Sequence, residues 1–537
     1  MYTEPMLEKD ELFAIGDSER IWKKYCGFLD LSLSEFMVIQ KLLLAEQLEL
    51  AINSELASKI MGAQKPKSVE EFRQVVPLTT YENYEPYLSQ KKAGALAQKP
   101  VLWAHTSGRT GLTKWVPYTK ETLDRLANDT LAAFILSSAT REKEVLLHEG
   151  VKVVLNLPPI PYIFEIMAFA AAQRMPYDAI PPSEDAAKMQ FEERIRQGFR
   201  TALYTGVDYA ASIAVVLAKV GESFSQLGWS TKFSQRTWHP LALFRLLKAI
   251  VKSKLIKRPV LPRDIWRVKG LVCGGIDTAI YRNQINYYWG TQPLDIYVST
   301  ETGFIAMQGW NKKGMTFVPY SNFYEFIPEE EGLKSKDDKK YQPSTVLLDE
   351  VEEGKTYEIV ITNFHGGPFF RYRLGDLIKI CSLKDEEAGV DLPQMIFQSR
   401  ADDIIDIAGF ARLDEKTLWQ AIQNTAVSYV DWSARKEVQQ GNPVLHLYLE
   451  LSDNKLDGHE VEHLIDQQLM TLNEDYQDFR NMTGTQPLVV TLLNQGSFQK
   501  YQLKKQAAGF DLAHLKPPHI SAPDAVISDL LYPSQES

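Results

Sequence analysis

At 537 residues and 61.1 kDa, the chain is longer than one hydrophobic core usually organises, so we expect two or more domains. Hydrophobic residues make up 45% of it and charged residues 24%, as in an ordinary globular protein, and the formal net charge of -10 argues against a general nucleic-acid binder. Three widely separated cysteines without a Cys-x-x-Cys pair argue against both a disulfide framework and a zinc site.

The chain carries no sign of a membrane span or of a signal peptide. Its most apolar stretch, 210–220, is far shorter than the ~20 residues that a span needs, and the amino-terminal residues are acidic. We therefore expect a cytoplasmic protein with neither a membrane nor a nucleic acid as partner.

The first predicted elements are helical and serve packing. Apolar residues at helical spacing predict a helix over 32–60, and a second helix is predicted over 120–137. Between them, the apolar run 101–104 predicts a buried strand that delivers the next segment to a site.

That next segment is the most informative one in the chain. It reads Thr106-Ser107-Gly108-Arg109-Thr110-Gly111-Leu112-Thr113-Lys114. Glycines let a backbone approach an anion, hydroxyls and N–H groups donate to it, and a lysine adds a compact positive charge, so this segment suits the phosphates of a nucleotide. It is not a Walker loop, because two residues rather than four separate its glycines. An ordinary surface loop is the alternative.

The middle of the chain predicts α/β layers. The short apolar runs 151–157, 268–273 and 294–298 are separated by helical segments, which is typical of α/β folds. Strand-like segments at 323–327, 358–362 and 377–380 follow without helices between them and predict a β-rich subregion, which the polar connection 381–394 ends.

We place a domain boundary near Ser399, which gives domains over 1–398 and 399–537. The second domain is predicted to be a compact α+β unit. Its expected elements are helices over 413–425 and 458–473 and strands over 444–451 and 487–493.

Three more segments could take part in nucleotide binding. The segment 297–303, Tyr-Val-Ser-Thr-Glu-Thr-Gly, follows a strand and offers an acid for Mg²⁺, although it could be a polar strand end. In 370–377, an acid after a glycine could accept both hydroxyls of a ribose, with a salt-bridged turn as the alternative. Residues 399–403 could combine a ribose-binding arginine with a hinge, or form a solvated linker.

In this order, the segments resemble the adenylate-forming superfamily of acyl-CoA synthetases, nonribosomal peptide adenylation domains and luciferase-type enzymes. The runs 76–87 (VPLTTYENYEPY), 270–290 (GLVCGGIDTAIYRNQINYYWG) and 324–328 (YEFIP) narrow the resemblance to the auxin-responsive family of acyl acid amido synthetases. It implies an α/β fold, with a large N-terminal adenylate-forming domain of layered α/β sheets and a small mobile C-terminal domain.

The resemblance also implies an activity. A carboxylic acid would react with ATP to give an acyl-AMP and pyrophosphate, and an amine, expected to be an amino acid, would then displace AMP. The residues that would bind ATP or AMP are Thr106, Ser107, Gly108, Arg109, Thr110, Gly111, Lys114, Gly274, Gly275, Tyr297, Ser299, Thr300, Glu301, Asp376 and Arg400. Glu301 would also hold Mg²⁺.

Lys114, Thr300 and Lys516 are the catalytic residues that the resemblance implies. Lys516 would bridge the carboxylate and the α-phosphate, and a compact point charge suits such an oxygen-rich transition state. Nearby lysines at 500, 504 and 505 are competitors that suit solvated helix positions. Asp402 matches the hinge about which the small domain would rotate between the half-reactions.

Three positions depart from the family pattern. Arg109 stands where a hydroxyl is usual, His519 replaces an arginine, and the stretch 365–369 is longer than usual. None of these changes removes a group that adenylation needs, so the chain is expected to be active.

Two other functions stay open. An acyl-CoA or acyl-carrier ligase would share the first step and use coenzyme A or a carrier thiol as acceptor, and a non-catalytic nucleotide-binding protein would keep the pocket alone. A dehydrogenase is disfavoured because no Gly-x-Gly-x-x-Gly follows a strand. The sequence does not identify the acid, because the candidate pocket residues Tyr162, Phe164, Tyr204, Phe304 and Met307 suit a core better than a pocket wall.

Overall fold

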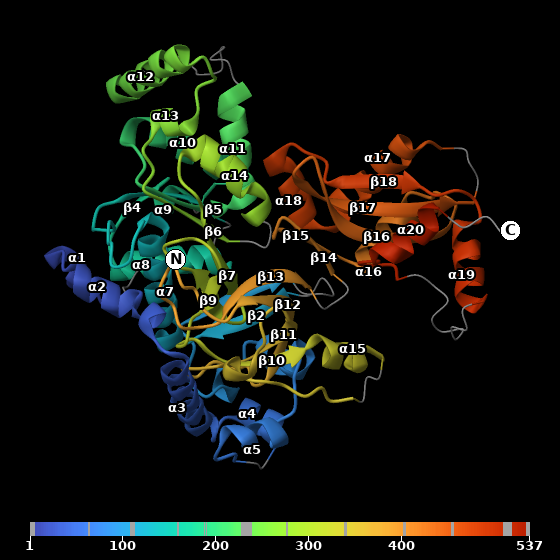
Figure 1. Ribbon diagram of the computed structural model, residues 1–537, viewed down its shortest axis with the longest axis horizontal. Coiled ribbons are helices and arrows are strands. Elements are labelled where there is room, and N and C mark those ends of the chain that lie inside the picture. Colours follow the sequence, from blue (N-terminus) through green and yellow to red (C-terminus); the bar gives the residue numbers. More distant parts are fainter. Residues whose placement is uncertain are drawn as a thin grey trace. The chain divides into compact units, whose positions relative to one another are not determined.

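The chain divides into two units, Met1–Ala401 and Asp402–Ser537, and no described sheet includes strands from both units (Figure 1). The computed structural model describes residues 6–62, 65–107, 113–157, 161–186, 188–189, 191–226, 239–274, 278–337, 341–400, 404–452, 456–507 and 518–532.

An 11-stranded sheet forms the centre of the first unit, counted over those residues. Pairing is parallel from β4 through β3, β5 and β6 to β7, and antiparallel elsewhere. The strands in spatial order are β10 (Asn322–Pro328), β11 (Thr356–Asn363), β12 (Tyr372–Ser382), β13 (Gln394–Arg400), β9 (Met315–Phe317), β8 (Gly303–Gln308), β7 (Leu294–Ser299), β6 (Gly270–Gly274), β5 (Tyr209–Ile213), β3 (Lys152–Asn156) and β4 (Asp178–Ile180).

Helices cover both faces of the parallel part, which is why its central strands β5 and β6 are buried along their whole length (Figure 1). α7 (Lys120–Ser138) and α8 (Ile163–Arg174) lie on one face, and α10 (Phe191–Thr205), α11 (Ala214–Gln226) and α14 (Thr278–Trp289) lie on the other. A Cβ on Gly270 would lie 2.1 Å from the Ser137 hydroxyl, so only glycine lets α7 pack this closely on β6.

The remaining helices of this unit lie around these layers. They are α1 (Leu12–Ile15), α2 (Ser18–Tyr25), α3 (Leu33–Ala51), α4 (Glu55–Met61), α5 (Val69–Val75), α6 (Glu85–Leu88), α9 (Ser183–Ala186), α12 (Pro240–Ile256), α13 (Pro262–Ile265) and α15 (Glu329–Asp337). Short 3-10 helices occupy Gly27–Asp30, Tyr81–Asn83, Ala93–Ala95 and Leu348–Glu350.

A separate hairpin carries the glycine-rich segment. β1 (Leu102–Ser107) and β2 (Thr113–Tyr118) pair antiparallel outside the large sheet. α7 begins directly after β2, because the Thr119 hydroxyl accepts a hydrogen bond of 3.1 Å from the Thr122 N–H and so caps the helix.

In the part of the second unit that the structure describes, the strands form two small sheets. β14 (Ile404–Ile407) pairs with β15 (Ala411–Asp414), and β17 (Asn442–Leu451) lies between β16 (Tyr429–Gln439) and β18 (Leu488–Leu492). Its helices are α16 (Glu415–Asn424), α17 (Gly458–Leu472), α18 (Glu474–Thr483), α19 (Ser497–Ala507) and α20 (Asp524–Leu531).

The expected α/β fold class is confirmed, with two corrections. The strand-like segments of the β-rich subregion do have a helix between them, α15, whose residues are mostly polar and so gave no apolar periodicity. The predicted helix over 32–60 is interrupted after Ala51, where Ser54 starts α4 by accepting from the Ala57 N–H. Among the helices that the structure describes, none has the length and apolar character to cross a membrane.

Candidate active site

The two ends of the glycine-rich segment belong to the paired strands β1 and β2. Thr106 pairs with Lys114, and Ser107 pairs with Thr113, so the backbone of these four residues belongs to the two strands. The predicted phosphate-binding residues Gly108, Arg109, Thr110 and Gly111 lie outside the described residues, as do the side chains of Thr106 and Ser107. The pairing of β1 with β2 therefore fixes the backbone of Lys114.

Lys114 and Glu301 meet although they come from separate elements. The Lys114 Nζ lies 3.7 Å from the Glu301 Oε1 and 5.2 Å from the centre of the Tyr81 ring. Tyr81 is itself fixed to β2, since its hydroxyl exchanges hydrogen bonds with the backbone of Trp115. Burial raises the pKa of Tyr81 to about 12, so this hydroxyl remains neutral.

The backbone around Glu301 is held by two side chains. The Tyr118 hydroxyl donates to the Thr300 carbonyl at 2.9 Å, and the Asn363 Nδ2 donates to the Glu301 carbonyl at 3.0 Å. Beside them, the Ser299 and Thr302 hydroxyls lie 2.9 Å apart and share a hydrogen bond. Burial raises the pKa of Tyr118, with the nearby Glu301 carboxylate adding to the effect. Glu301 is thus presented on a fixed turn after β7.

Asp376 contacts Tyr297, which is on the strand that leads to the Glu301 turn. The Tyr297 hydroxyl, on β7, donates to the Asp376 Oδ2 on β12 at 2.6 Å, and both side chains are buried. Asp376 pairs in register with Arg400, although the Arg400 side chain is outside the described part. The positive φ of 77° at Gly375, just before this acid, favours glycine there.

The two arginines before Asp376 have structural partners. Arg371 makes a bidentate pair with the buried Glu325, with Nε–Oε2 and Nη2–Oε1 distances of 3.0 and 2.8 Å. Arg373 pairs in the same way with Glu358 at 2.9 and 2.6 Å. Salt bridges, the alternative considered for segment 370–377, are therefore made by these two arginines. The Asp376 carboxylate accepts a hydrogen bond from Tyr297.

Gly274 ends β6 at the carboxyl edge of the parallel strands. A Cβ there would lie 2.4 Å from the Phe164 ring on α8, so glycine permits this packing. Gly275 lies outside the described residues. Ligands of open α/β sheets commonly bind at this edge, which is also where β7 delivers Ser299 and Thr300.

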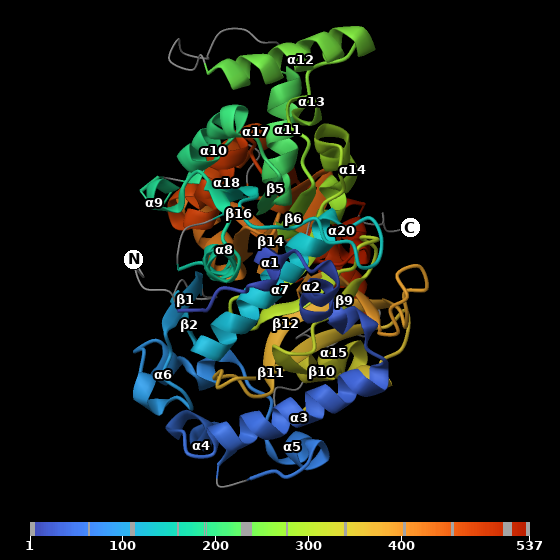
Figure 2. The same ribbon diagram turned by 90° about the vertical axis from the view of Figure 1, so that its left-hand side faces the viewer.

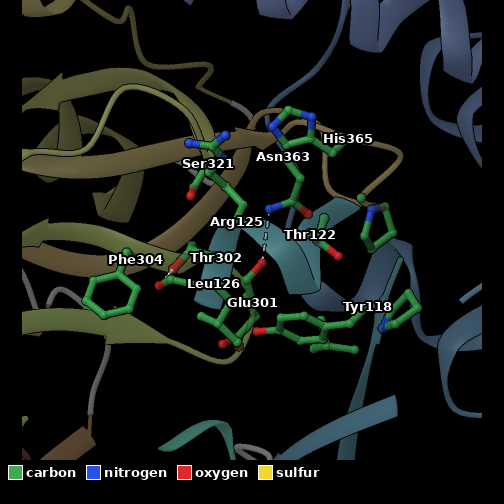
Figure 3. Close-up of a pocket in the computed structure, with 15 residues that line it drawn as sticks. Tyr118, Thr122, Arg125, Leu126, Glu301, Thr302, Phe304, Ser321, Asn363 and His365 are labelled. Atoms are coloured by element: carbon green, nitrogen blue, oxygen red, sulfur yellow. Dashed lines mark hydrogen bonds between the residues drawn. The ribbon is translucent and has the colours of Figure 1, made fainter. Parts of the chain in front are cut away.

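A pocket opens beside Glu301 (Figure 3). Its volume is about 430 Å³, counting space open to solvent. Its apolar lining includes Leu126 and Phe304, and its polar lining includes Thr122, Arg125 and His365. Lys114 and Asp376 are not among the lining residues, although Lys114 lies 3.7 Å from Glu301.

Two further groups determine the polarity of the pocket. Burial lowers the pKa of His365, and its Nε2–H donates to the Tyr320 carbonyl at 2.9 Å, so a neutral ring is favoured. Arg125 lies over the Tyr320 ring, 4.9 Å from its centre, and makes no ion pair with any residue that the structure describes. The stretch 365–369 is fixed by Gln47, which accepts from the Gly366 N–H and donates to the Gly367 carbonyl.

In the second unit, His519 stands where the family pattern has an arginine. The His519 ring stacks on Trp432, and its nitrogens lie 2.8 Å from the Asp431 and 2.6 Å from the Glu415 carboxylates. These hydrogen bonds raise the pKa of His519, that to Asp431 most. The predicted Lys516 and the hinge residue Asp402 lie outside the described residues.

Several residues that surround Lys114 and Glu301 were not predicted from the sequence. Tyr118 had a usable signal, because alternation along β2 puts Lys114, Val116 and Tyr118 on one face of the strand. Tyr81 and Asn363 act through the backbone and carry no such pattern. Across the described ranges, no group of three or more His, Cys, Asp or Glu side chains could hold a metal ion, so Glu301 is not part of such a group.

Comparison with known proteins supplies the family. Models of the GH3 family match over residues 27–152 (N-terminal domain), 315–400 (central domain) and 415–524 (C-terminal domain). The jasmonoyl-L-amino acid synthetase GH3.5 of Oryza sativa subsp. japonica is 22% identical over an alignment of 561 positions, gaps included, which covers 90% of this chain and 92% of that protein. The indole-3-acetic acid-amido synthetase GH3.5 of Arabidopsis thaliana is 23% identical over 429 residues, or 68% of this chain and 67% of that protein.

A solved structure supports the fold. A 2-hydroxyisobutyryl-CoA ligase in complex with 2-HIB-AMP and CoA matches with a TM-score of 0.55 at 14% identity, over 86% of this chain and 87% of that one. At this identity the likeness concerns the fold alone. With all three domain models matching in family order, the resemblance seen in the sequence is confirmed, and the chain belongs to the GH3 family.

Proposed function

We propose that the chain is an ATP-dependent acyl acid amido synthetase that joins a carboxylic acid to an amine, with an amino acid as the acceptor. The observation that carries this proposal is that β7 and the turn after it are contacted by two distant parts of the chain, since Lys114 lies 3.7 Å from Glu301 and Asp376 accepts a hydrogen bond from Tyr297. Family membership supports it, because the relatives named above are amido synthetases.

In the first step, a carboxylate oxygen of the acid attacks the α-phosphorus of ATP. The bond to the bridging oxygen breaks, and pyrophosphate leaves with the electron pair. Both reactants are anionic, so donors and cations must be in place before they meet. Among the residues that the structure describes, Lys114 would supply positive charge to the phosphates. Residues 106–111 are proposed to add N–H groups and hydroxyls, and Lys516 a second ammonium.

Glu301 is proposed to hold Mg²⁺ together with the phosphates. Mg²⁺ is usually bound by one or two carboxylates plus substrate phosphate oxygens, so we expect Glu301 to hold the ion when the nucleotide is present. When bound, the ion would neutralise phosphate charge. Lys114, now 3.7 Å from Glu301, would then be shared with the phosphates.

Asp376 is proposed to accept hydrogen bonds from the ribose hydroxyls. The Tyr297 hydroxyl holds one oxygen of this carboxylate in place. Arg400, which pairs with Asp376 across β12 and β13, would assist, and Gly274 with Gly275 would let the nucleotide approach the backbone. Thr300 would contact the α-phosphate.

The pocket beside Glu301 is proposed to take the acyl group. Leu126 and Phe304 offer apolar contact, while Arg125 and the neutral His365 offer polar groups. In the second step, an amine attacks the acyl carbonyl, AMP leaves and the amine releases one proton. A rotation of the second unit about Asp402 would withdraw Lys516 and admit the amine.

The test is acid-dependent exchange of pyrophosphate into ATP, measured over a panel of carboxylic acids. The acids that support exchange are then incubated with ATP and either amino acids or coenzyme A. We expect AMP release to depend on an amino acid and to yield an amide. Thioester formation instead would favour the acyl-CoA ligase, and ATP binding without exchange by any acid would favour the non-catalytic alternative.

A further inference from the structure

The helix α12 turns small residues toward the protein and large apolar residues toward solvent, which is the reverse of an ordinary surface helix. Its side toward the protein presents small residues, Ala242 and Ala249, which are 6% and 0% exposed. Its opposite side presents large apolar residues at helical spacing. Phe244, Leu247, Val251 and Leu255 are 68%, 61%, 57% and 79% exposed.

α12 lies at the margin of the first unit, beyond α10, α11 and α13 in both views (Figures 1 and 2). It is anchored there rather than loosely attached. The Arg245 Nη1 donates to the Leu203 carbonyl at 2.8 Å, and the Lys252 Nζ lies 3.0 Å from the buried Asp264 carboxylate. The apolar side is therefore held outward by the fold.

The helix is also strongly basic within an acidic protein. Residues 240–258 contain six cations and no acid, whereas the whole chain has a net charge of -10. The exposed Lys248, Lys254 and Lys257 form no ion pair with any residue that the structure describes. Cations thus flank an outward apolar stripe.

A basic hollow adjoins the end of the helix. Its volume is about 960 Å³, counting space open to solvent, and its lining includes Lys252, Arg258, Arg263 and Arg267 together with Trp266. The lining contains no acidic residue. Behind it, Asp264 is already bound by Arg258 at 2.6 and 2.8 Å, so the hollow keeps an excess of positive charge.

We propose that α12 and this hollow form a binding surface for an anionic membrane. The apolar stripe would enter the headgroup region, the flanking lysines would meet anionic lipids, and the hollow would receive a headgroup phosphate. From the sequence we expected no membrane partner because no segment could span a bilayer. A helix that lies in the interface needs no such length.

A second copy of the chain fits this surface less well. Two copies joined through α12 would bring one set of lysines against the other, and like charges at an interface oppose binding. The lipid surface instead complements both properties of the helix, its apolar stripe and its positive charge.

The test is flotation of the full chain with vesicles of phosphatidylcholine alone and of phosphatidylcholine mixed with phosphatidylserine. We expect binding to the anionic vesicles only, and we expect it to weaken as salt screens the lysines. No flotation, or equal flotation with both vesicles, would overturn the proposal.

Two variants separate the apolar stripe from the charge. Phe244→Ser with Leu247→Ser should lower the vesicle affinity about a hundredfold, since removing each apolar contact is worth about tenfold. The matched control is Val38→Ser with Leu42→Ser on α3, whose side chains are 56% and 61% exposed, and it should bind as the unchanged protein does. Circular dichroism establishes that each variant is folded.

Charge reversal keeps the apolar stripe intact. Lys248→Glu, Lys254→Glu and Lys257→Glu, made together, should lower the vesicle affinity by on the order of a hundredfold, about fivefold or more for each lysine. Lys23→Glu, Lys59→Glu and Lys65→Glu, made together, are the control. Unchanged vesicle binding by the triple-lysine variant of α12 would overturn the proposal. A dimer in solution that Phe244→Ser with Leu247→Ser abolishes would also overturn it, and would show that a second copy of the chain occupies this surface.

Discussion

Replacing Asp376 with alanine should weaken ATP binding about a hundredfold. The carboxylate is buried, and the Tyr297 hydroxyl at 2.6 Å orients it. A hydrogen bond to a charged group contributes about 1.5–3 kcal/mol, so two bonds to the ribose contribute about 3 kcal/mol or more. Since ~1.4 kcal/mol is a factor of ten, this corresponds to about a hundredfold in Kd.

The control for this experiment is Tyr297→Phe. It leaves the carboxylate in place but removes its buried donor, so the folded protein should lose about 1–3 kcal/mol of stability. ATP affinity should fall less than in Asp376→Ala. Thermal unfolding and calorimetric titration with ATP measure the two effects separately.

A ribose analogue makes the assignment specific. If Asp376 accepts a ribose hydroxyl, 2′-deoxy-ATP should bind the unchanged protein about tenfold more weakly than ATP does. In Asp376→Ala the two nucleotides should bind alike. Equal affinity of the unchanged protein and Asp376→Ala for ATP would refute the reasoning.

The other predictions concern charge and buried pairs. Glu301→Gln should raise the Mg²⁺ concentration needed for pyrophosphate exchange, and an unaltered metal titration would count against its role. Lys516→Ala should slow acid-dependent exchange about a hundredfold or more, and near-normal exchange would contradict its assignment. Because hydrogen bonds raise the pKa of His519 above 6.5, its stabilising contribution is complete below that pH and is lost as the pH rises through the raised value. His519→Gln should therefore lower the unfolding midpoint at about pH 6 and have little effect at about pH 9, and an equal loss at both would oppose the charged state. Arg371→Met should cost about 3–5 kcal/mol in denaturant unfolding by leaving Glu325 buried without its partner, and a loss below ~1 kcal/mol would exclude this role.

The parallel strands were predictable because they are buried on both faces. β3, β6 and β7 appear in the sequence as short, mostly apolar runs. β4 and β9 have three residues each, too few for any period to show. α15 is polar around its circumference and was missed for that reason.

The candidate site was predictable as separate segments but not as a geometry. Lys114 and Glu301 were named from motif and resemblance, yet their distance depends on how the hairpin lies against the end of β7. Tyr118 and Asn363 position that turn through backbone carbonyls, which no motif records. The outward stripe of α12 was equally hidden, since helical spacing does not reveal which side faces solvent.

Acid-dependent exchange of labelled pyrophosphate into ATP is the most direct test of the proposed activity. We expect at least one carboxylic acid to support exchange, and Lys114→Ala to reduce it by on the order of a hundredfold, because this ammonium would meet the charge that develops on the phosphates. Exchange at the same rate in Lys114→Ala, or no exchange with any acid by a protein that binds ATP, would contradict the account.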